Sequence, residues 1–106
     1  MSVELGKETV SELHHSHRTV GTSAVRLTTL AFPLLKGVLM RAPGAADPAP
    51  NVGVIFVGGA GVTADTSASG GLPIPPGEIL FLPIDDPSKV WVISTQAAQD
   101  IGWISM

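Results

Sequence analysis

The chain has 106 residues, a length that suits one small domain with a single core. Charged residues make up only 14% of it, against about 25% in ordinary soluble domains. Nine acidic and six basic residues leave a net charge of -3, so we expect no nucleic-acid partner. There is no cysteine, which excludes disulfides and thiolate metal sites. No stretch suggests a signal peptide or a membrane span, so no membrane partner is expected either.

Residues 1–19 are expected to form an N-terminal extended arm, with room for one helical turn or a strand, whose order depends on a partner; residues 20–106 are expected to form the folded domain. Residues 9–12 have the capping-box pattern of a helix start, but no apolar periodicity follows them. The arm holds the only candidate ligand cluster, His14, His15 and His17. Because zinc prefers four ligands, a solvated or interface cluster is the favoured interpretation. Three copies meeting on a symmetry axis could still bind a metal or an anion.

From Arg18 onward, short apolar runs alternate with turns rich in Gly, Pro, Asp and Ser, and no long helical pattern occurs. This spacing is typical of an antiparallel sandwich or barrel. The run at residues 52–57 organises the chain, because its branched and aromatic side chains suit a buried strand that ends at Gly58. We expect an all-β antiparallel β-sandwich with jelly-roll-like connections. Its strands are expected at residues 23–28, 36–42, 52–57, 72–74, 78–84, 89–94 and 100–106.

Three of the expected strands have apolar residues on both faces, namely those at residues 52–57, 79–84 and 90–93. A sandwich in water usually shows polar residues on its outer faces. Loops and the arm could cover the second face. The favoured interpretation is that a partner covers it, since large exposed apolar patches usually mark interfaces. The candidate interface residues are Leu80, Leu82, Trp91 and Ile93, together with His14, His15 and His17.

No motif in the chain points to catalysis. Gly59, Gly61 and Ala64 imitate the dinucleotide fingerprint, but loop composition follows where that motif requires a helix. Asp85 and Asp86 precede a proline and are typical of a turn. We therefore expect no enzyme activity, no catalytic or metal-binding residues and no cofactor. Trp91 and Trp103 could stack on sugar rings in a groove, although such residues are more often core or interface anchors.

Several blocks occur in a characteristic order, namely VGTSA (20–24), KGVLM (36–40), IFVGGAGVT (55–63), LPIPPGE (72–78), VWVIS (90–94) and QDI (99–101). In this order they resemble the small β-sandwich structural proteins of tailed-bacteriophage virions, over residues 20–106. The most specific parts are the VGGAGVT block and the PPGE turn. Two features depart from that family. The connector at residues 43–51 is longer than usual, and the arm before Arg18 has no counterpart.

The resemblance implies a capsid cement or decoration protein that binds the outer capsid surface and bridges major capsid protein subunits. Its implied partners are the major capsid protein and itself, as a homo-dimer or homo-trimer. The implied location is the virion, after synthesis in the host cytoplasm. A head-fibre base, tail or connector component is the first alternative, and a sugar-binding β-sandwich module is a second one. The family implies no catalytic residues, so none are assigned.

Overall fold

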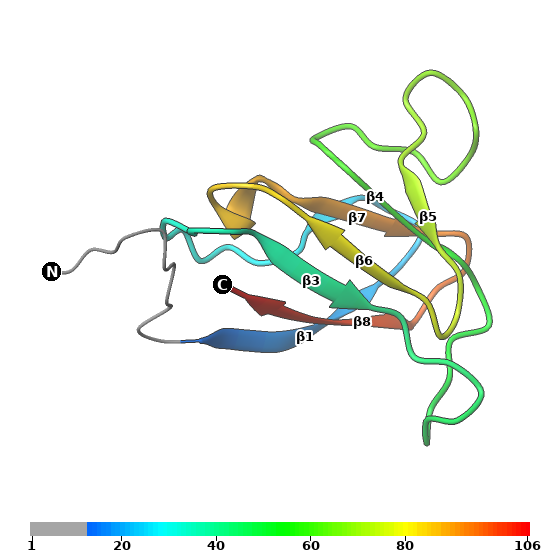
Figure 1. Cartoon of the computed structure of the whole chain (residues 1–106). Helices are drawn as coiled ribbons and strands as arrows, with labels where there is room; N and C mark the ends of the chain where they lie inside the picture. Colours follow the sequence, from blue (N-terminus) through cyan, green and yellow to red (C-terminus); the bar gives the residue numbers. More distant parts are fainter. Residues whose placement is uncertain (1–12) are drawn as a thin grey trace, which may run out of the picture.

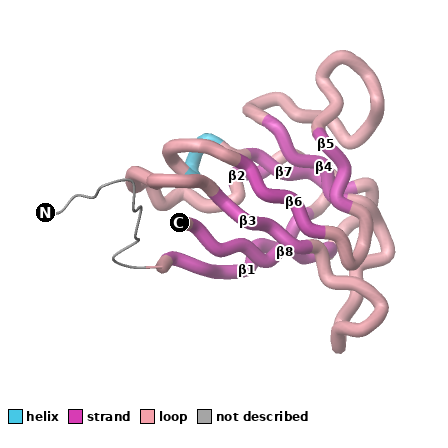
Figure 2. Tube along the Cα trace, viewed as in Figure 1, coloured by secondary structure: helices cyan, strands magenta, loops and turns pink. Residues whose placement is uncertain are grey.

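The computed structural model of the chain describes residues 13–106 and shows an all-β fold (Figure 1). Apart from one turn of 3-10 helix, η1 (Pro87–Lys89), these residues form strands and loops (Figure 2). None of the described residues belongs to a helix long and apolar enough to cross a membrane. The strands are β1 (His14–Val20), β2 (Val25–Arg26), β3 (Val38–Arg41), β4 (Ile55–Gly58), β5 (Leu72–Ile74), β6 (Ile79–Leu82), β7 (Trp91–Ser94) and β8 (Gln99–Ser105).

The strands form two four-stranded antiparallel sheets. The first sheet has the order β1-β8-β3-β6, and the second has the order β2-β7-β4-β5. Strands β1 and β6 are therefore the edges of the first sheet. The expected all-β antiparallel fold is confirmed at this level.

The main core lies between the sheets, because alternate residues of a strand point to opposite faces. The first sheet supplies the inward side chains of Val38, Met40, Ile101 and Trp103, and the second supplies Ile55, Val57, Ile74 and Val92; all of them are buried in one cluster. Val20 from the end of β1 and Val90 before β7 belong to the same cluster and are fully buried, and Leu27 and Ala42 are buried in it as well. Burying one such side chain contributes roughly 1.5–3 kcal/mol.

The outer face of the second sheet has its own small cluster. Phe56 of β4 and Ile93 of β7 point away from the main core, and both are buried. Val62 and Ala64, from the loop between β4 and β5, pack against them. On this sheet the chain therefore covers much of its own second apolar face, which was the less favoured interpretation of the sequence.

Strand β1 begins inside the segment that the sequence assigned to the arm. Residues 14–20 are paired with β8, from His14 opposite Ser105 to Val20 opposite Gln99, and all of them except Val20 belong to the expected arm. Only Val20 of this strand is buried, so the strand has no apolar alternation that the sequence could reveal. Its backbone ladder holds it instead. The rest of the expected arm, including the capping-box pattern at residues 9–12, lies outside the described residues.

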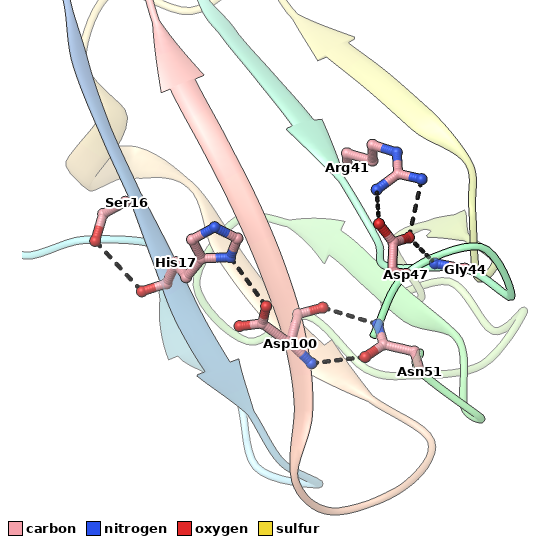
Figure 3. A network of polar contacts seen from close by, with 7 residues as sticks. All are labelled: Ser16, His17, Arg41, Gly44, Asp47, Asn51 and Asp100. Carbon is pink, nitrogen blue, oxygen red and sulfur yellow. Dashed lines mark hydrogen bonds and ion pairs between the residues drawn. The ribbon is translucent and has the colours of Figure 1, made fainter. Parts of the chain in front are cut away.

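Two amide side chains tie the loop before β4 to β8, and Figure 3 shows the first of them, Asn51. The Asn51 side chain donates to the Asp100 carbonyl at 2.8 Å and accepts from the Asp100 amide at 2.8 Å. Oε1 of Gln99 accepts from the amides of Val52 at 2.7 Å and Gly53 at 2.9 Å. Because these amides bind a side chain rather than a neighbouring strand, β4 starts at Ile55 and not at Val52.

Candidate functional site

The outer face of the first sheet carries a row of apolar side chains across three adjacent strands. Leu39 of β3 lies opposite Ile104 of β8 on one side and opposite Phe81 of β6 on the other. Leu39 and Ile104 are half-buried, and Phe81 is 42% exposed. On β1, His15 lies opposite Ile104 and continues the row. Opposed residues of an antiparallel pair share a face, so these four side chains form one continuous strip.

The neighbouring row has a glycine near its centre. Gly102 of β8 lies between His17 on β1 and Arg41 on β3, and Arg41 lies opposite Ile79 on β6. A Cβ atom at Gly102 would lie 2.9 Å from Cε1 of His17, so the histidine ring sits close over the β8 backbone. Gly102 also lines a hollow of about 270 Å³, here named the Gly102 hollow. Its lining comes from β1, β3, β6 and β8 and includes His15, His17, Leu39, Arg41, Ile79 and Ile104.

Polar pairs fix the rim of the Gly102 hollow (Figure 3). Nδ1 of His17 is 2.9 Å from Oδ2 of Asp100. The Arg41 guanidinium contacts both carboxylate oxygens of Asp47, at 3.2 and 3.0 Å, and the Gly44 amide donates to the same carboxylate. The hydrogen bond from Arg41, with that from Gly44, lowers the pKa of Asp47 below its ordinary value. Arg41 therefore keeps its anionic partner at neutral and mildly acidic pH, and loses it only as the pH falls through that lowered pKa.

The three histidines of the predicted interface do not share one face. The ring of His14 lies against Phe32, with 4.1 Å between the ring centroids, whereas His15 and His17 are on the outer face. Within residues 13–106, no group of three or more His, Asp or Glu side chains is placed to hold a metal ion. Of the three histidines, His15 and His17 therefore lie on the outer face of the first sheet and line the Gly102 hollow.

Leu80 and Leu82, also predicted at the interface, turn inward. Both are half-buried and pack against the main core. They line one side of a groove of about 420 Å³ that runs between β6 and the second sheet. The side chains of β6 that face outward are Ile79, which is 59% exposed, and Phe81. If Leu80 and Leu82 contact a partner, they therefore do so at this groove and not on the outer face of the first sheet.

Trp91 and Ile93 lie on the second sheet, away from the Gly102 hollow. Ile93 is buried in the cluster with Phe56, and Trp91 is half-buried beside it. Cζ of Arg26 lies 5.4 Å from the Trp91 ring centroid, at the distance of a cation–π contact. Trp103 is only 5% exposed and belongs to the main core. Trp103 is therefore not available to stack on a sugar ring, and Trp91 is only partly exposed.

The chemistry available on the outer face suits recognition. The pair of His17 and Asp100 has the histidine–carboxylate part of a hydrolytic triad, but a nucleophile must also lie within reach of the imidazole. Among residues 13–106, no Ser or Thr hydroxyl is hydrogen-bonded to the His17 ring. An apolar strip with a hollow beside it and paired polar groups around it matches the centre and rim of a protein interface.

Gly102, Leu39 and Ile104 were not identified as site residues from the sequence. The signal was present in DIGWISM, where alternation places Asp100, Gly102 and Ile104 on one face and Ile101 and Trp103 on the other. A buried tryptophan would have marked the second set as core and the first as the outer face.

Comparisons with models of protein families, with curated proteins and with solved structures find no match.

Proposed function

We propose that this chain is a capsid cement protein of a tailed bacteriophage. It binds the outer surface of the capsid and stabilises the shell by bridging major capsid protein subunits. The observation that carries the proposal is the outer face of the first sheet, where Ile79 and Phe81 are exposed beside the Gly102 hollow. A protein that attaches to a shell after assembly needs such a face on its folded form, because an exposed apolar patch gains free energy when a partner covers it.

The strand pairing supports the virion assignment through its topology. Strand β1 pairs with β8, β2 with β7, β3 with β6 and β4 with β5, which is the pairing of a long hairpin folded over into two sheets. This is the connection pattern expected of a jelly roll, an architecture that occurs in viral capsid domains and in lectins. A shared architecture does not by itself assign a function. It makes the proposed class of protein compatible with the fold.

The two most specific parts of the resemblance are turns with clear structural roles. The block at residues 57–63 ends β4 and brings Val62 back over the second sheet, with Val62 packed so close to Gly58 that a Cβ there would lie 2.8 Å from it. The turn at residues 75–78 joins β5 to β6, with Gly77 at a φ of 86° and the Glu78 amide donating to the Pro75 carbonyl at 3.0 Å. These blocks support a shared fold. The outer face of the first sheet supports the function.

Gly102→Val is expected to fill the hollow and weaken attachment to capsid shells at least roughly tenfold, the loss that follows from about 1.4 kcal/mol at an interface anchor. Gly102 has no positive φ, and the atoms nearest to an added Cβ belong to the largely exposed His17 side chain and not to backbone, so the fold should survive. The measurement is co-sedimentation with shells assembled from the major capsid protein encoded in the same genome.

Leu30→Ser is the matched control. Leu30 is 59% exposed, the same fraction as Ile79, but it lies in a loop and not on the outer face of the first sheet. It should bind the shell like the wild-type protein. The proposed function would be rejected if the wild-type protein failed to sediment with the shell. Equal binding by the wild-type protein and Gly102→Val would place attachment on another surface.

A further inference from the structure

One edge of the first sheet leaves its backbone groups open. Just before β6, the Glu78 carbonyl accepts from the Ala42 amide at 3.1 Å, and antiparallel pairs alternate between hydrogen-bonded and non-hydrogen-bonded positions. Leu80 and Leu82, in register with Met40 and Val38, therefore direct their backbone groups toward β3. The intervening residues, Ile79 and Phe81, direct theirs away from β3. Strand β6 ends the sheet, so these groups meet no other strand among the described residues.

The two edges of the first sheet differ in charge and polarity. Strand β1 carries His15, His17 and Arg18, and charged or polar side chains on an edge discourage pairing with another copy. Strand β6 has no charged residue between Ile79 and Leu82, and its exposed side chains are apolar. An open, uncharged, apolar edge is the feature that favours addition of another strand.

The open stretch of β6 is short and has defined limits. Before it, the Gly77 amide already donates to the Ala42 carbonyl at 2.8 Å. After it, Pro83 has no amide hydrogen to donate. Only Ile79 and Phe81 can therefore donate to an added strand. A partner strand that uses both donors and both acceptors must present two outward-directed residues of its own at the same spacing. Strand β6 of a second copy has the same two residues and therefore meets this requirement.

We propose that β6 pairs in antiparallel register with β6 of a second copy of this chain, about a two-fold axis that passes beside Leu80. In this register Ile79 lies opposite Phe81 of the second copy, and each exchanges both backbone hydrogen bonds. A shift by two residues in one direction would place Pro83 opposite Ile79, and a shift in the other would require the occupied Gly77 amide. The register centred on Leu80 is the one in which the open backbone groups of Ile79 and Phe81 are hydrogen-bonded in both copies.

The same register matches the side chains on both faces. On the outer face, Ile79 packs against Phe81 of the second copy, which covers the two most exposed side chains of β6. On the inner face, Leu80 meets Leu80 of the second copy at the mouth of the groove lined by Leu80, Leu82 and Ile84. The two first sheets join into one, and their outer faces become continuous. This pairing does not depend on the proposed capsid partner.

Leu80→Cys tests the register directly, since the chain has no other cysteine. Leu80 and its copy form a non-hydrogen-bonded pair, whose Cα atoms lie about 4.5 Å apart. That separation is within the range of about 4.4–6.8 Å over which a disulfide can form. Mild oxidation should therefore give a cross-linked dimer rapidly. Phe81→Cys should cross-link at least roughly tenfold more slowly, because Phe81 lies opposite Ile79 and not opposite its own copy. Leu30→Cys is the exposed control for random collision.

Sedimentation velocity of the wild-type protein supplies the second readout. We expect a concentration-dependent dimer, and Phe81→Lys should weaken it at least roughly tenfold because the lysines add charge to the shared edge. Gly102→Val should still dimerise, which separates this interface from capsid docking. A wild-type protein that stays monomeric up to about 1 mM would overturn the proposal. A dimer that survives Phe81→Lys, or a Leu80→Cys protein that cross-links no faster than Leu30→Cys, would overturn it as well.

Discussion

Trp103→Ala is expected to lower the free energy of unfolding by about 3–5 kcal/mol, the range for removal of a large aromatic side chain from a core. Trp103 is 5% exposed and lies on β8, between β1 and β3, where it lies opposite Ser16 and Met40. Removal of the indole would leave a cavity that four strands of a small sheet cannot close. Because a small domain is stabilised by only about 5–15 kcal/mol in total, this loss is a large fraction of the free energy of unfolding.

Ile104→Ala is the matched control for this substitution. Ile104 is the next residue of β8 and points to the outer face, where it is only half-buried. Its truncation should cost less than about half as much, since less apolar area returns to water. Urea unfolding followed by circular dichroism measures both variants without relying on tryptophan fluorescence. Equal losses for the two substitutions would contradict the assignment of inner and outer faces on β8.

Gly37→Ala is expected to destabilise the protein by about 3 kcal/mol or more, from backbone strain together with steric overlap. Gly37 has a φ of 150°, which L-residues rarely adopt. An added Cβ would overlap the carbonyl oxygen of Leu82 and lie 2.9 Å from Cα of Pro83. Both contacts are with backbone, which cannot move aside without separating β3 from β6. The two hydrogen bonds that Gly37 exchanges with Met106, each 2.9 Å, would be lost with them.

Gly21→Ala provides the control, because no atom lies within 4 Å of the position its Cβ would take and its φ is not positive. Its effect should stay within about 1 kcal/mol. Urea unfolding of both variants, followed by tryptophan fluorescence, makes the comparison. A Gly37→Ala protein as stable as Gly21→Ala would show that β3 and β6 are not held as tightly as described.

Strands with buried, branched side chains were predictable from the sequence. The expected short strand at residues 72–74 coincides with β5, and the runs at 36–42, 78–84 and 89–94 each contain one strand. A strand in the arm was left open, but β1 could not be located because exposed histidines and an arginine give no apolar alternation, so only its pairing with β8 defines it. The start of β4 was placed too early because the role of the Gln99 side chain as acceptor for Val52 depends on a contact distant in sequence.

The candidate site was less predictable, for a related reason. Alternation correctly separated Ile79 and Phe81 from Leu80 and Leu82, but both pairs are apolar, so the sequence alone could not tell which pair faces inward. Strand β3 decides this point, since its buried Val38 and Met40 are in register with Leu82 and Leu80. The Gly102 hollow depends on three strands aligned beside one glycine. Such an alignment follows from the sheet order and not from local pattern.

The measurement that tests the proposed function most directly is the heat stability of capsid shells with and without this protein. A protein that binds the assembled shell and not its separated subunits must raise the temperature at which the shell comes apart, and the rise must grow with the concentration of free protein. We predict a concentration-dependent upward shift with the wild-type protein and with Leu30→Ser, and a much smaller shift with Gly102→Val. Shells that come apart at the same temperature with and without saturating wild-type protein would contradict the cement function.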